Sequence, residues 1–194
     1  MKKKILISII VITVLAVLDN QSPHAQENSS ITAKEVYVSE EFNSARGGMV
    51  LYSENVTIPS SVSAEFINRR LAGTEMAGLG QAFKNAEAKY GVNAIFLTGL
   101  AIHESNYGKS MIAQAKNNLF GFMAYDSSPF SSAGYFESFE AGIDHVARYL
   151  GQHYLNQGGQ YYNGTSIAAI NVKYATDQEW AVKIMSRIRA FLAN

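Results

Sequence analysis

One carboxylate lies inside an otherwise apolar stretch of this sequence. Residues 96–110 read FLTGLAIHESNYGKS, and they place Glu104 at helical spacing from Leu97, Leu100 and Ala101. A solvated glutamate belongs on the polar side of a helix, so we expect this carboxyl group to be partly withdrawn from water. Such withdrawal disfavours the charged form and raises the pKa towards neutrality, which makes the group a competent proton donor. The sequence therefore predicts a general acid of the kind that glycoside hydrolysis requires.

A metal site is the first alternative for this stretch. A zincin motif needs a second histidine four residues after His103, and that position holds Tyr107. His145 and His153 lie eight residues apart with no carboxylate at useful spacing, and the chain contains no cysteine. We therefore expect neither a metal nor a cofactor, and we interpret His103 as a structural residue.

Composition and charge limit the class of protein. The chain has 194 residues, of which 47% are apolar and 16% are charged, as is typical of one globular domain with appendages. Residues 26–194 carry 13 Lys and Arg against 15 Asp and Glu, because three Lys and one Asp lie in residues 1–25. Since there is no basic stripe, we do not expect the chain to bind nucleic acid.

The first 25 residues have the order of an export signal. A basic start precedes a nearly unbroken apolar run at residues 5–18, and a polar segment ends at Ala25. The run is shorter than the roughly 20 residues that span a bilayer comfortably. Pro23 fits a cleavage site poorly, so an uncleaved anchor that tethers the protein to the membrane is the alternative to a cleaved signal. In either case we expect an exported protein, outside the cell or in the cell wall.

The remaining chain divides into an arm and a domain. Residues 26–60 are rich in Ser, Asn, Glu and Thr, which predicts a linker or loosely ordered arm with one strand packed on the domain. Two aromatic-rich runs around a long turn at 117–138 predict a small β-hairpin lobe. Cap residues and apolar periodicity predict helices over 64–71, 81–90, 94–107, 110–115, 139–155, 167–175 and 176–192. We therefore expect an α+β fold, with a mostly helical domain over residues 61–194.

Four segments resemble glycoside hydrolase family 73, the bacterial endo-β-N-acetylglucosaminidases of autolysin and flagellar type. They are AIHESNYGKS, LAGTEMAGLGQAFKNAEAKYGVNAIFL, NNLFGFMAYDSSPF and VKYATDQEWAVKI, and together they extend over roughly residues 63–194. The resemblance implies a lysozyme-like domain that hydrolyses the β-1,4 bond between N-acetylglucosamine and N-acetylmuramic acid in peptidoglycan. It also implies that the partner is the glycan strand. We expect the enzyme to act as a monomer.

The resemblance assigns roles to two residues. Glu104 matches the family's catalytic acid, and Tyr174 matches a tyrosine that faces the cleft. For the second carboxylate, Asp126 and Glu137 are the candidates by residue type and plausible reach. The alternative is that the N-acetyl group of the substrate acts as the nucleophile.

Sugar binding needs aromatic platforms and amide partners, and we expect Asn118, Phe122 and Tyr125 to line the groove. Two rival functions remain at this point. One is a lytic transglycosylase or muramidase on the same fold, and the other is a cell-wall-binding module without catalytic activity.

Overall fold

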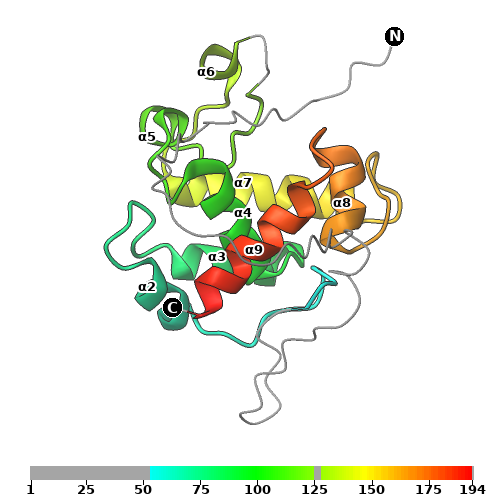
Figure 1. Cartoon of the computed structure of the whole chain (residues 1–194), viewed down its shortest axis with the longest axis horizontal. Coiled ribbons are helices and arrows are strands. Elements are labelled where there is room, and N and C mark those ends of the chain that lie inside the picture. Colours follow the sequence, from blue (N-terminus) through cyan, green and yellow to red (C-terminus); the bar gives the residue numbers. More distant parts are fainter. Residues whose placement is uncertain (1–52, 125–127, 194) are drawn as a thin grey trace, which may run out of the picture.

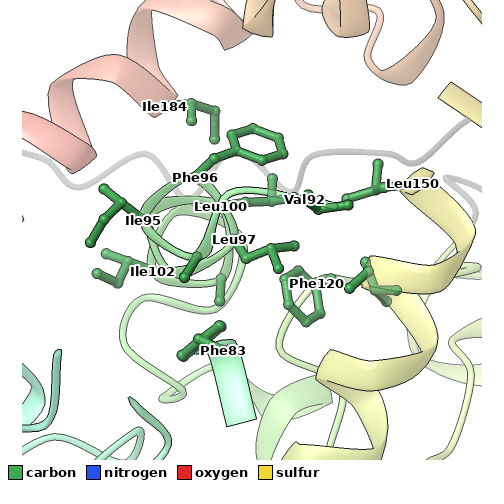
Figure 2. Packing of buried hydrophobic residues seen from close by; sticks show 14 of the residues in the cluster. Phe83, Val92, Ile95, Phe96, Leu97, Leu100, Ile102, Phe120, Leu150 and Ile184 are labelled. Atoms are coloured by element: carbon green, nitrogen blue, oxygen red, sulfur yellow. The ribbon is translucent and has the colours of Figure 1, made fainter. Parts of the chain in front are cut away.

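Helix α4 (Ala94–Ser105) forms the centre of the fold. The computed structural model describes residues 53–124 and 128–193, and α4 lies near the middle of the view in Figure 1. Figure 2 looks along this helix and shows Ile95 and Ile102 on one side of it, with Phe96 and Leu97 pointing in other directions into the core. The positions at helical spacing from Glu104 are therefore only part of the buried surface of α4, because Thr98 and Gly99 are buried as well. A helix that is apolar on all sides is one that the core surrounds, and most of α4 is of this kind.

The helices around α4 come from both halves of the chain. Helix α4 packs against α3 and α9, α3 packs against α2 and α7, and α8 packs against α9. The first α-helices, α2 (Ala64–Leu71) and α3 (Gly80–Tyr90), precede α4 in the chain. Those that follow are α5 (Met111–Lys116), α6 (Pro129–Ser132), α7 (Phe139–Leu150), α8 (Ile167–Tyr174) and α9 (Trp180–Ala193).

Local sequence signals set most helix ends. The side chain of Ser63 caps α2, that of Asn93 caps α4 and that of Ser166 caps α8, each by accepting hydrogen bonds from backbone N–H groups of the first turn. Helix α9 begins four residues later than expected, at Trp180. The expected helix over 139–155 divides into α7 and a π-helical turn, η1 (Gly151–Leu155).

The expected β-hairpin at 117–138 is not found as strands in the ranges that the structure describes. Its two sides are joined by single backbone hydrogen bonds, from Gly134 N to Phe122 O and from Phe136 N to Lys116 O, both 2.9 Å. The Asn118 side chain accepts a hydrogen bond from Phe122 N, which removes a donor that a strand ladder would use. In the described ranges the lobe is therefore a folded loop that follows α5 and carries α6.

The described end of the arm packs on the helices. Val56 is fully buried, and its backbone N–H donates to Thr165 O at 2.9 Å while its carbonyl accepts from Asn93 N at 2.7 Å. An isolated antiparallel bridge joins Asn55 to Ser166. Residues 53–60 therefore belong structurally with the domain, at the N-terminal end of α4.

The predicted export signal, most of the arm and the segment 125–127 lie outside the described residues. Of the helices that are described, none combines the length and the apolar composition needed to cross a membrane.

A glycine allows α4 and α9 to approach closely. A Cβ at Gly99 would lie 2.4 Å from Cγ1 of Ile188, so Gly99→Val is expected to destabilise the fold by about 1–3 kcal/mol. Thermal unfolding of Gly99→Val, Ile188→Ala and the double variant measures this. We expect the double variant to lose clearly less stability than the two single losses combined, since the truncation makes room for the valine. Additive losses would contradict the contact.

Candidate active site

Glu104 occupies the last turn of α4, where the backbone turns sharply. Asn106, Tyr107 and Gly108 have φ values of 50°, 59° and 82°, all in the left-handed region. Ser105 stabilises this end, since its hydroxyl donates to Ala101 O at 2.6 Å and accepts from Gly108 N at 2.8 Å. The helix therefore stops one residue after Glu104, two residues earlier than the sequence predicts, which leaves the carboxyl group at a helix C-terminus.

Burial raises the pKa of Glu104 to about 7, and a hydrogen bond from Trp180 opposes the rise. The indole Nε1 of Trp180 donates to Oε1 of Glu104 at 3.0 Å. The negative end of the α4 dipole also disfavours a carboxylate at this position. At neutral pH a large fraction of Glu104 is therefore protonated, with one oxygen oriented by Trp180.

Tyr174, at the end of α8, packs beside this pair. Its ring centroid lies 4.7 Å from that of Trp180, and the residue is only 2% exposed. Burial and the nearby charge of Glu104 hold the pKa of the phenol well above its ordinary value. The buried hydroxyl has no hydrogen-bond partner among the described residues. The Tyr174 hydroxyl therefore stays protonated and is free to donate a hydrogen bond to a ligand.

His103, on α4, lies near the charged side chains of Arg187 and Lys183 on α9. Burial and the positive charges of Arg187 and Lys183 lower its pKa to about 4, so the ring is neutral at physiological pH. Its Nδ1 is buried with no hydrogen-bond partner in the described part of the chain. His103 therefore packs between the two helices and is not part of the Glu104 pair.

The other residues expected from the sequence lie in different surroundings. Asn118 is 1% exposed, and its amide donates to the carbonyls of Phe122 and Gly134 at 2.9 Å. Phe122 is also buried and packs against neighbouring rings. Glu137 is exposed and directly precedes Ser138, the N-cap residue of α7. Asn118 thus holds the loop together, and no contact places Glu137 beside Glu104 within the described ranges.

Asp126 and Tyr125 lie outside the described residues, so the structure says nothing of their positions. Among the residues that it does describe, no cluster of three or more His, Cys, Asp or Glu is arranged to hold a metal ion.

Trp180 is the functional residue that sequence reasoning missed. Periodicity placed it correctly on the buried side of the last helix, but a core position did not reveal its hydrogen bond to Glu104. The two residues are 76 positions apart, so only tertiary packing brings them together. The available signal was that Trp180 is the single tryptophan of the chain and follows Tyr174 closely, because a buried indole N–H requires an acceptor.

Comparison with known proteins identifies the family. The model of the glucosaminidase family, described as mannosyl-glycoprotein endo-beta-N-acetylglucosaminidase, matches residues 80–192, which contain Glu104, Tyr174 and Trp180. This chain belongs to the glucosaminidase family. The resemblance to glycoside hydrolase family 73 is thereby confirmed.

Two relatives of this glucosaminidase illustrate the match. A Streptococcus pneumoniae serotype 4 protein, provisionally named endo-beta-N-acetylglucosaminidase, is 33% identical over 138 residues, covering 69% of this chain and 21% of the relative. A bifunctional autolysin of Staphylococcus aureus is 28% identical, covering 63% of this chain and 12% of the autolysin. The glucosaminidase chain therefore spans about a fifth or less of the length of these relatives.

Solved structures share the fold of this glucosaminidase. S. aureus autolysin E matches with a TM-score of 0.59 at 24% identity, covering 73% of each chain. A catalytic mutant of the same autolysin, in complex with the disaccharide NAG-NAM, also has a TM-score of 0.59, covering 72% of this chain and 70% of the other. The mostly helical architecture is thus that of the autolysin glucosaminidases.

Proposed function

We propose that this glucosaminidase is an endo-β-N-acetylglucosaminidase that cuts peptidoglycan glycan strands after N-acetylglucosamine, at the β-1,4 link to N-acetylmuramic acid. One observation carries the proposal: the Glu104 carboxyl, with its pKa raised to about 7, is oriented by Trp180 beside the unused hydroxyl of Tyr174. Cleavage of a glycosidic bond requires an acid that protonates the oxygen of the leaving sugar, and a carboxylic acid that is protonated near neutral pH can do this.

Glu104 acts first as the acid. Its proton passes to the glycosidic oxygen while the bond from C1 to that oxygen breaks, and the N-acetylmuramic acid portion leaves as an alcohol. The resulting carboxylate then accepts a proton from the water that attacks C1, which restores the acid. The indole N–H of Trp180 stabilises the carboxylate between these steps through the hydrogen bond that it donates.

Tyr174 contributes a neutral donor beside the acid. Because its pKa is raised by burial and by Glu104, the phenol keeps its proton throughout the working pH range. We infer that a substrate oxygen, such as that of the N-acetyl group, accepts this hydrogen bond. That contact would orient the N-acetyl oxygen relative to C1.

The group that completes the reaction at C1 is the substrate's own N-acetyl oxygen or a second carboxylate. Glu137 has no contact with Glu104 within the described ranges, and its side chain faces the solvent. This supports the N-acetyl group over Glu137, which is exposed. Asp126 is the competing candidate. An Asp126→Asn variant with unchanged kcat would support the N-acetyl route.

The substrate class is supported by the relatives. The pneumococcal relative is named for endo-β-N-acetylglucosaminidase activity, and autolysin E was crystallised with NAG-NAM. We propose that the protein acts as a monomer in the cell wall after export, with residues 5–18 as signal or tether. We further propose a lysozyme-like arrangement in which the lobe at 117–138 closes over the strand.

Product analysis tests the proposal against its rivals. Purified peptidoglycan should be cut to fragments with a reducing N-acetylglucosamine end, whereas anhydro-muramic ends would indicate a lytic transglycosylase and reducing muramic ends a muramidase. No cleavage, with binding retained, would indicate a wall-binding module. A mannosyl-glycoprotein is the second substrate to test, because the family description names one; cleavage of it in place of peptidoglycan would contradict the proposal.

The pH profile provides a further prediction. Only protonated Glu104 is active, so kcat/KM should fall about tenfold per pH unit above roughly pH 7. Trp180→Phe removes the hydrogen bond that lowers this pKa. The pH above which kcat/KM falls should therefore rise by about one unit. Profiles of kcat/KM for both proteins, measured between pH 4 and 9, check this. An unchanged or lower value of this pH in Trp180→Phe would contradict the assignment.

A further inference from the structure

Four aromatic rings form a closed cluster next to the Glu104 pair. Tyr149 contacts His153 at 4.4 Å between ring centroids, His153 contacts Tyr161 at 6.4 Å, Tyr161 contacts Tyr154 at 5.0 Å, and Tyr154 contacts Tyr149 at 6.3 Å. We call these residues the aromatic quartet. None of them was assigned a role by the motif that led to Glu104.

The π-helical turn η1 makes this cluster possible. In an α-helix Tyr149 would face the residue four positions on, which is His153. In η1 the N–H of Asn156 donates to Gly151 O, five residues back, at 3.1 Å, so the helix widens and Tyr154 contacts Tyr149 too. Single π turns of this kind are rare and occur frequently at functional sites.

The loop after η1 is folded back onto the turn. The backbone N–H of Tyr161 donates to His153 O at 2.8 Å. A Cβ at Gly159 would lie 2.5 Å from the same carbonyl oxygen, so glycine permits this close return. The ring of Tyr161 is thereby held beside His153, and both residues remain half-buried.

The quartet is continuous with the proposed catalytic residues. The ring of Tyr154 lies 5.6 Å from that of Tyr174, and Tyr174 packs on Trp180, which is bonded to Glu104. The phenol of Tyr149 is close enough to Tyr174 to contribute to its raised pKa. A glycan strand held at Glu104 therefore has these rings within the reach of its neighbouring sugars.

The chemistry around the quartet suits a neutral sugar. From Gly151 to Val172 the sequence contains no Asp, Glu, Lys or Arg. The same segment carries exposed amide side chains instead, on Gln152, Asn156, Gln157, Gln160 and Asn163. Rings that stack on the apolar face of a sugar, with amides for its hydroxyl and N-acetyl groups, fit N-acetylglucosamine better than the acidic lactyl group or the charged peptide stem.

We propose that His153 and Tyr161 form a binding subsite for one N-acetylglucosamine ring of the strand, adjacent to the cleavage position. This inference rests on the proposed function and extends it, because it names N-acetylglucosamine as the sugar of the strand that binds at His153 and Tyr161. The subsite would act on substrate binding and leave the chemical step to Glu104.

Binding without turnover tests the subsite. In a Glu104→Gln background, isothermal titration calorimetry with the peptide-free tetrasaccharide of alternating N-acetylglucosamine and N-acetylmuramic acid gives the parent affinity. His153→Ala and Tyr161→Ala should each weaken binding about five- to tenfold, as expected for loss of one ring contact. His153→Phe and Tyr161→Phe should restore most of the affinity, because each keeps a ring that can stack on the sugar. Ile58→Ala, at an exposed apolar side chain near the N-terminal end of α4, is the control and should bind like the parent.

Kinetics in the wild-type background provide the second measurement. His153→Ala should raise KM about five- to tenfold and leave kcat within about twofold, with an unchanged melting temperature. Parent-like affinity in both alanine variants, or a fall in kcat at constant KM, would overturn the subsite. If Tyr161→Ala fails to fold, the affinity and KM of His153→Ala alone test the subsite. Failure of the parent to bind the tetrasaccharide, or of the wild type to cut peptidoglycan, would instead overturn the proposed function.

Discussion

Replacing Glu104 with Gln is expected to reduce peptidoglycan hydrolysis by about 10²–10⁴-fold, the range that general acid catalysis contributes. The amide has nearly the same shape and can still accept the hydrogen bond from Trp180 Nε1, but it has no proton to transfer to the glycosidic oxygen. Turbidity loss of purified cell walls, together with a cell-wall zymogram, measures the rate of both proteins.

Stability separates this prediction from simple unfolding. The native pKa of Glu104, about 7, lies above its ordinary value of 4.5, so between these values the native state holds a proton that the unfolded state has lost. The wild type should therefore lose stability as pH rises from about 4.5 to 7, by roughly 3 kcal/mol at most. Glu104→Gln should lack this slope and be at least as stable at pH 8. An active, equally folded Glu104→Gln protein would refute the role of Glu104.

The second large effect is expected at the opposite end of α4. Glu87 is 5% exposed, and its Oε1 accepts hydrogen bonds from Ser60 N at 2.7 Å and Ala94 N at 2.8 Å. Its other oxygen pairs with Lys84. Burial alone would raise the pKa of Glu87, but the hydrogen bonds from Lys84, Ala94 and Ser60 outweigh it and lower the pKa.

Glu87→Ala should therefore destabilise the domain by about 3–5 kcal/mol, because it leaves the buried N–H groups of Ser60 and Ala94 without a partner and removes the negative charge that pairs with Lys84. The melting temperature should fall by about 10 °C, as measured by circular dichroism. Lys89→Ala is the control: it breaks the exposed pair with Asp144 and should change stability by less than about 1 kcal/mol. Equal losses in the two variants would show that Glu87 does not join the arm, α3 and α4.

Local signals in the sequence were sufficient for most of the secondary structure. Ser63, Asn93 and Ser166 cap helices where side-chain chemistry predicts it. The loop at 117–138, where we expected a hairpin, was not predictable in this way, since aromatic-rich runs are equally compatible with a loop that Asn118 organises by side-chain hydrogen bonds. The π turn η1 was likewise invisible, because its residues have ordinary helical periodicity.

The sequence by itself determined that Glu104 would be a withdrawn carboxyl, because its position in an apolar helix is a local property. It also determined the family, through motifs spread along the chain. Only the tertiary structure decided what surrounds that carboxyl. Trp180 and Tyr174 reach it from α9 and α8, and the aromatic quartet extends from them. These neighbours are set by helix packing over long sequence separations, and no local pattern of residues encodes a hydrogen bond between positions 76 apart.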